Sequence, residues 1–106
     1  MKTSPKKSQK LLLKPEQPEL RPILDYPVQD EKISARHYSI RLTVADPADQ
    51  VDVSIDQGPW RQCRKTHGHW WYDWMDFDAG EHEVIARARA GDGRWMVSMP
   101  NEFMVV

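Results

Sequence analysis

The sequence predicts a small all-β sandwich preceded by an N-terminal arm. Apolar side chains alternate with polar ones in several short runs, which is the pattern of strands with one buried face. Turn-forming residues follow these runs at intervals of about ten residues. No run has the 3.6-residue periodicity of an amphipathic helix. The 106 residues provide for one domain of this kind, which we place at residues 22–106.

We expect residues 1–21 to form a disordered, basic arm. Three prolines interrupt this segment, and proline disfavours helix at the residue before it. The segment holds six basic and two acidic side chains, whereas residues 22–106 hold nine basic and fourteen acidic ones. The arm is either a solvated extension or a tether whose lysines contact an acidic or phosphate-rich surface.

The first half of the folded part contains four expected strands. Residues 22–33 form an edge strand interrupted at Pro27, because proline within sheets is confined to edges and bulges. Residues 36–45 form a strand whose side chains alternate between apolar and polar over residues 38–44, and residues 51–56 alternate in the same way. Residues 46–49 have turn chemistry between them, and residues 60–65 form a further short strand.

The second half contains an aromatic strand over residues 69–77 and the longest strand over residues 81–90. Three aromatic side chains share one face of the first strand, namely Trp70, Tyr72 and Trp74. We expect this face to be buried against the small side chains of the longest strand, namely Ala86, Ala88 and Ala90. Residues 94–99 and 102–106 form a last strand broken at residues 100–101.

The same alternation predicts that Trp71 points away from the core, beside Asp73. An exposed tryptophan is a platform for a partner side chain or a sugar ring, unless lead-in residues such as Leu24 or Tyr26 cover it. Trp60 and Trp95 lie near turns and either close the ends of the sandwich or extend the binding surface. The candidate binding residues are aromatic or basic and lie on outward faces or near turns: Trp71, Arg87, Arg89, Trp60 and Trp95.

Catalytic and metal-binding patterns are weak. Cys63, His67 and His69 lack the second ligand pair of a structural zinc site. The acidic residues between 73 and 83 straddle a turn, which favours solvated carboxylates over a glycosidase or calcium site. No phosphate-binding glycine loop is present. We therefore expect no enzymatic activity, no metal and no cofactor.

Composition also predicts the cellular compartment of the protein and the classes of partner that it does not bind. The single cysteine rules out an internal disulfide, and no apolar run is long enough for a signal peptide or a membrane span. These features predict a cytoplasmic protein with no membrane association. Because the folded part is acidic, we do not expect it to bind nucleic acid.

Three segments carry a family resemblance: VDVSIDQGPWRQC, the G-x-W-x-Y-x-W run at residues 68–74, and GEHEVIARARAGDGR. They resemble the immunoglobulin-like early-set (E-set) domains of bacteria, including accessory modules. The C-terminal dimerisation domain of the sulfite oxidase family is similar, down to an ending that here is RARAGDG at residues 87–93. The resemblance implies an immunoglobulin-like sandwich of about seven strands with an assembly or accessory role, without molybdenum chemistry.

The leading hypothesis is therefore a non-enzymatic interaction or assembly module. Its partner is another protein or a second copy of the chain, as in a homodimer or an accessory subunit. The alternative is a carbohydrate-binding module in which Trp71 and Trp60 form an aromatic platform. A small hydrolase is the third class, and it requires a pocket with converging polar groups.

Overall fold

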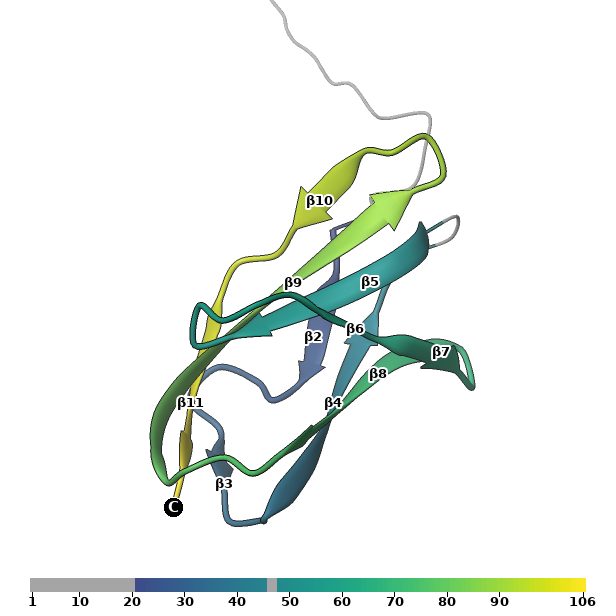
Figure 1. Ribbon diagram of the computed structural model, residues 1–106. Coiled ribbons are helices and arrows are strands. Elements are labelled where there is room, and N and C mark those ends of the chain that lie inside the picture. Colours follow the sequence, from purple (N-terminus) through teal and green to yellow (C-terminus); the bar gives the residue numbers. More distant parts are fainter. Residues whose placement is uncertain (1–20, 46–47) are drawn as a thin grey trace, which may run out of the picture.

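The computed structural model describes residues 21–45 and 48–106, which fold into two β-sheets packed face to face (Figure 1). These residues contain no helix. The strands in chain order are β2 (Ile23–Tyr26), β3 (Lys32–Ile33), β4 (His37–Thr43), β5 (Ala48–Ile55), β6 (Arg61–Gln62), β7 (Arg64–Thr66), β8 (His69–Met75), β9 (Gly80–Ala90), β10 (Trp95–Val97) and β11 (Asn101–Val105). The all-β sandwich expected from the sequence is confirmed. The expected arm lies outside the described residues, except for Arg21.

One sheet has four strands in the order β2-β4-β8-β7. The other has six, in the order β3-β11-β9-β5-β6, and β10 pairs with β9 beside β11. All neighbours are antiparallel except β3 and β11, which run parallel. Each sheet therefore combines strands from both halves of the sequence.

The chain crosses between the sheets several times, and two of these crossings test predictions made from the sequence. The interruption predicted at Pro27 is confirmed, because β2 and β3 lie on either side of it in different sheets. The single strand predicted for residues 60–65 is wrong: β6 belongs to one sheet and β7 to the other. Cys63 lies between them, is buried in the core, and donates its backbone N–H to the carbonyl of Val51 at 2.8 Å.

The turn predicted for residues 46–49 is also wrong in its second half. Ala48 and Asp49 already belong to β5. Ala48 pairs with Ala90 of β9, and the register shifts between Ala48 and Gln50. This long-range pairing extends the strand past the point where local turn chemistry would end it, because strand pairing adds backbone hydrogen bonds that composition does not report.

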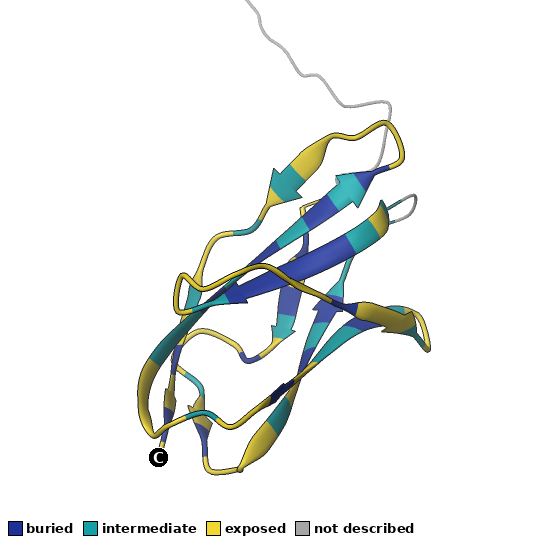
Figure 2. Ribbon diagram, viewed as in Figure 1, coloured by how far each residue is buried: buried dark blue, intermediate teal, exposed yellow. Residues whose placement is uncertain are grey.

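The core lies between the sheets, where the buried residues of both layers face each other (Figure 2). Trp70 and Trp74 of β8 are buried, as predicted, and so are Ala86 and Ala88 of β9. Trp74 stacks on Phe77, with ring centroids 3.9 Å apart, and contacts Phe103 edge to face at 5.5 Å. The small alanines leave room for the large rings of the opposite sheet.

Strand β9 is the longest and pairs with β5, β10 and β11. Its buried side chains alternate with outward ones from Val84 to Ala90. The outward side chains of β9 therefore lie near the middle of one broad sheet face.

We expect Trp74→Ala to lower the free energy of unfolding by about 3 to 5 kcal/mol, because it removes a ring packed in the core. The neighbouring change Met75→Ala is the matched control: Met75 is exposed, so its loss should cost less than about 0.5 kcal/mol. Urea unfolding followed by circular dichroism measures both. Equal losses from the two variants would contradict the core assignment.

Candidate interaction surface

Two tryptophans enclose Arg87 on the outer face of the six-stranded sheet. The guanidinium carbon of Arg87 lies 4.3 Å from the ring centroid of Trp60 and 4.0 Å from that of Trp95. Trp60 precedes β6, Arg87 lies in β9, and Trp95 begins β10, so three separate segments meet here. Each such cation–π contact contributes about 0.5 to 2 kcal/mol, according to how far water is excluded. Both tryptophans remain partly exposed.

The turn after β5 brings Trp60 to this position. Asp56 and Gln57 both have positive φ, at 55° and 61°, and the N–H of Gly58 donates to the carbonyl of Ile55 at 2.9 Å. Two consecutive positive φ angles define the hairpin turn whose twist matches that of paired strands. The chain therefore reverses and returns beside β5 as β6, on the side away from β9, and the Trp60 ring reaches Arg87 from there.

The buried carboxylate of Asp52 also binds Arg87. The Nε of Arg87 donates to Oδ2 of Asp52 at 2.9 Å, and the side chain of Asp52 is 3% exposed against 27% for Arg87. Gln50 donates its side-chain amide to both carboxylate oxygens, at 3.3 and 3.2 Å. A buried charge requires a charged partner and hydrogen bonds, so Asp52 fixes the guanidinium in one orientation.

Arg89 extends the cluster along β9. Its Nε donates to Oδ1 of Asp49 at 3.1 Å, and its guanidinium carbon lies 5.7 Å from the ring centroid of Trp95. We call the four residues Trp60, Arg87, Arg89 and Trp95 the Trp–Arg cluster. It contains four of the five side chains that the sequence pointed to as binding residues.

The fifth, Trp71, lies on the other sheet. It points outward from β8, between Arg41 of β4 and Arg64 of β7 in the strand register. Its indole N–H donates to the carbonyl of Thr66 at 3.1 Å, which leaves the ring half-buried. The platform imagined from Trp71 and Trp60 is not formed, because the two residues belong to different sheets.

The lead-in residues considered as a cover for Trp71 lie elsewhere. Leu24 is part of the core, opposite Leu42 of β4. Tyr26 is exposed, and the guanidinium carbon of Arg41 lies 4.6 Å from its ring centroid. Since β4 separates β2 from β8, Trp71 is covered by its own hairpin.

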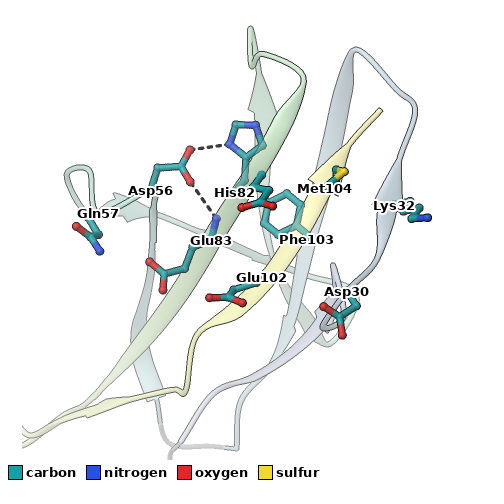
Figure 3. A pocket seen from close by; sticks show the side chains of 10 residues that line it. Asp30, Lys32, Asp56, Gln57, His82, Glu83, Glu102, Phe103 and Met104 are labelled. Carbon is teal, nitrogen blue, oxygen red and sulfur yellow. Dashed lines mark hydrogen bonds and ion pairs between the residues drawn. The ribbon is translucent and has the colours of Figure 1, made fainter.

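The outer face of the six-stranded sheet also has an acidic end, made of Asp56, Glu81, Glu83 and Glu102. Figure 3 labels Asp56, Glu83 and Glu102 of this group. These side chains line a hollow of about 540 Å³ together with Lys32 and others. Glu83 and Glu102 lie directly opposite each other on β9 and β11. Like charges at opposite positions of a strand pair destabilise a sheet, and the carboxylates at this end outnumber its basic side chains, Lys32 and His82.

His82 connects the turns at this end to the core. Its Nδ1 lies 2.6 Å from a carboxylate oxygen of Asp56, and its Nε2 lies 2.8 Å from the carbonyl oxygen of Asp78. The ring also stacks on Phe103 and meets Trp74 edge to face. Because both ring nitrogens face acceptors, both must carry hydrogen, which is the imidazolium form.

Burial lowers the pKa of His82. The hydrogen bonds to Asp56 and Asp78, together with the charges of these two residues, raise the pKa by more than burial lowers it. The net result is a pKa above the usual histidine value.

The other side chains that could act as nucleophiles make structural contacts or are buried. The hydroxyl of Thr43 donates to Asp25 at 2.6 Å and lies 3.2 Å from Nδ1 of His69. A hydroxyl whose hydrogen points at a carboxylate is not activated by the histidine beside it. Burial, with the charge of Asp52, raises the pKa of the Cys63 thiol to about 12, so the nucleophilic thiolate does not form near neutral pH. Among residues 21–45 and 48–106, no three His, Cys, Asp or Glu side chains are grouped as metal ligands.

Sequence reasoning missed the burial of Asp52 and the contacts of His82. The alternation of β5 put Asp52 on an outward face, which predicts exposure, yet its side chain is buried and bonded to Arg87 and Gln50. The one available signal was the pairing of an outward aspartate with an outward arginine, and it could be used only once β5 was known to pair with β9.

The sequence matches no known protein-family model and no curated protein. Solved structures are similar in fold. The CbhA fibronectin(III)-like modules of Clostridium thermocellum superpose with a TM-score of 0.68 at 22% identity, over 79% of this chain and 93% of theirs. CopC from Methylosinus trichosporium OB3b superposes with a TM-score of 0.64 at 16% identity, over 82% of this chain and 93% of its own.

A modular endo-β-1,4-mannanase from Cellulomonas fimi superposes with a TM-score of 0.65 at 17% identity, over 92% of this chain and 20% of the enzyme. Similarities at identities this low show the fold alone, and that fold is an immunoglobulin-like β-sandwich. The finer resemblance to early-set domains and to the sulfite oxidase dimerisation domain stays a prediction. Within the described ranges, no helix could cross a membrane.

We expect Arg87→Met to lower the free energy of unfolding by about 3 kcal/mol, because it leaves the buried Asp52 carboxylate without its cation. Arg89→Met is the control, and its loss should stay below about 1 kcal/mol because its partner Asp49 is exposed. Chemical denaturation of both variants at neutral pH tests this. If the two losses were the same, Asp52 would not depend on Arg87.

We expect the stability contributed by His82 to be present below about pH 6.5 and to fall as pH rises through its raised pKa in the folded state. His82→Gln should remove this fall. Urea unfolding between about pH 6 and pH 8 measures it, with exposed His67→Gln as the control. A pH dependence that persists in His82→Gln would assign the effect to another group.

Proposed function

We propose that this chain is a non-catalytic module that binds a protein partner through the outer face of its six-stranded sheet. The observation that carries the proposal is the Trp–Arg cluster. Tryptophan and arginine are among the residues most enriched at the energetic centres of protein interfaces. Two tryptophans and two arginines gather here on one sheet face, held by contacts to Asp52 and Asp49.

The rigidity of the cluster supports a binding role. Arg87 is held by one carboxylate and two aromatic rings, so a partner that contacts it loses little side-chain freedom on binding. The exposed side chains of β10 continue the same face: Val97 lies opposite Arg87, and Trp95 lies opposite Arg89. A partner thus meets apolar surface beside fixed cationic groups.

The groups described above also support a role without catalysis. His82 has both ring nitrogens engaged, the Cys63 thiol is buried with a raised pKa, and the Thr43 hydroxyl donates to a carboxylate. The fibronectin(III)-like modules that share the fold agree with a module of this type.

The proposal predicts where a partner can be captured. We expect a photo-crosslinking residue placed at Val97 to form a covalent adduct with a protein in cells that express the chain natively. The same probe at Met75 is the control, because Met75 lies on the other sheet with a similar exposure, 58% against 51% for Val97. Mass spectrometry identifies the adducts.

Trp60→Ala in the Val97 probe chain should reduce the adduct severalfold, since it removes one ring from the cluster. Equal labelling from Val97 and Met75, or no protein adduct from Val97, would refute this surface as the binding site.

Carbohydrate binding is the second candidate. It is favoured by the two partly exposed tryptophans of the Trp–Arg cluster and by the similarity to a segment of a modular mannanase. Arg87 lies over one face of each ring, so a sugar would use the remaining faces. Tryptophan fluorescence titrated with glucans, chitin, xylan and mannan tests this candidate, and a flat response to all four would remove it.

A further inference from the structure

The outward side chains of β9 form a row whose charge changes sign at its centre. In order along the strand they are Glu81, Glu83, Ile85, Arg87 and Arg89. Strand pairing on both sides keeps these alternate residues on one face without a register shift between Gly80 and Arg89. Two acidic side chains thus precede Ile85, and two basic side chains follow it at matching intervals.

This row of charges is complementary to the same row in a second copy of the chain that is rotated by 180°. Alternate residues of a strand are about 7 Å apart, so Glu83 and Arg87 lie about 7 Å on either side of Ile85. Glu81 and Arg89 lie about 14 Å on either side of it. A two-fold axis through Ile85 therefore places each glutamate of one copy opposite an arginine of the other.

We propose that two copies of this chain pack face to face through their six-stranded sheets, with the β9 strands antiparallel about a two-fold axis at Ile85. This inference rests on the proposed function and names the partner as a second copy. The interface is isologous, because the same row serves both subunits. It contains two Glu83–Arg87 pairs and two Glu81–Arg89 pairs.

The glutamates of the acidic half make no ion pairs with the described residues of their own chain. Glu81, Glu83 and Glu102 make no ion pair within residues 21–45 and 48–106, and Glu83 faces Glu102 across the strand pair. An arginine from a second copy offsets this repulsion.

The basic half retains the donors that such pairing needs. Arg87 bonds Asp52 through Nε, and Arg89 bonds Asp49 through Nε. A guanidinium carries five N–H groups, so the terminal nitrogens of both arginines can still donate to a second carboxylate. Each arginine then bridges a carboxylate of its own chain and one of the second copy.

Apolar side chains surround the charged row and supply area that leaves water on association. They include Trp60 and Trp95 near the basic half, Val97 on β10, and Met104 near the acidic half. Two sheets that pack face to face keep their strands within about 30° of one another, which is compatible with antiparallel β9 strands.

A charge exchange tests the register. Glu81→Lys places lysine opposite Arg89, and Arg89→Glu places glutamate opposite Glu81, so each variant alone has two repulsive contacts in its dimer. Mixed in equal amounts, the two variants form a heterodimer in which both contacts are attractive. We expect the wild-type chain to dimerise and each variant to raise the dimer dissociation constant at least about 10-fold. We expect the equimolar mixture to restore a dissociation constant close to that of the wild-type dimer.

Sedimentation velocity over a wide concentration range measures these states, with circular dichroism to confirm folding of every variant. Asp73→Lys is the control: it reverses one exposed charge on the other sheet and should leave the dimer unchanged. If Arg89→Glu does not fold, Arg89→Gln replaces it, and a weaker wild-type dimer at high salt supports the ion pairs.

A wild-type chain that stays monomeric at every concentration would overturn the inference. So would a dimer that Glu81→Lys does not weaken, or a mixture that does not recover. The Val97 crosslink separates this failure from that of the proposed function. An adduct with a different protein keeps the proposed function and removes the second copy, whereas the absence of any protein adduct removes both.

Discussion

Strand β9 alternates its side chains without interruption, and the rest of the structure depends on that alternation. Its inward side chains are small, which lets the large rings of β8 pack between the sheets. Its outward side chains, which are charged except for Ile85, form the row from Glu81 to Arg89. Because a strand presents successive residues to opposite faces, a shift of one residue would move the charges into the core and the alanines to the surface. The register of β9 therefore determines both which side chains form the core and which form the binding surface.

Buried charge is confined to one position of this sheet, under the Trp–Arg cluster. Asp52 is buried and bonded to Arg87 and Gln50, and Arg87 is held in place by Asp52 and by the rings of Trp60 and Trp95. Such an arrangement adds little net stability compared with apolar packing, but removing either partner is costly. Its physical effect is to fix the direction of a guanidinium group on an otherwise ordinary sheet face. The proposed partner contacts are built on that fixed direction.

The two ends of the outer face differ in how their charges are balanced. Near Ala90, each arginine has an aspartate on the neighbouring strand β5. Near Gly80, the carboxylates face one another, and Lys32 and His82 are the basic side chains at the hollow. Because of this imbalance, one end of the face along β9 is acidic and the other carries the arginines. This difference is the physical basis for pairing the face with a second copy in the opposite orientation.

Period-two alternation is a local property, so the sequence by itself determined the strands, the buried faces of Trp70 and Trp74, and the outward positions of Arg87 and Arg89. It also placed the edge interruption at Pro27, because proline lacks the backbone donor that a ladder needs. Tertiary structure decided which distant strands became neighbours. It separated Trp71 from Trp60, divided residues 60–65 between two sheets, and buried Asp52. These outcomes depend on pairing between segments far apart in the chain, such as β5 with β9, and no local pattern encodes that choice of partner.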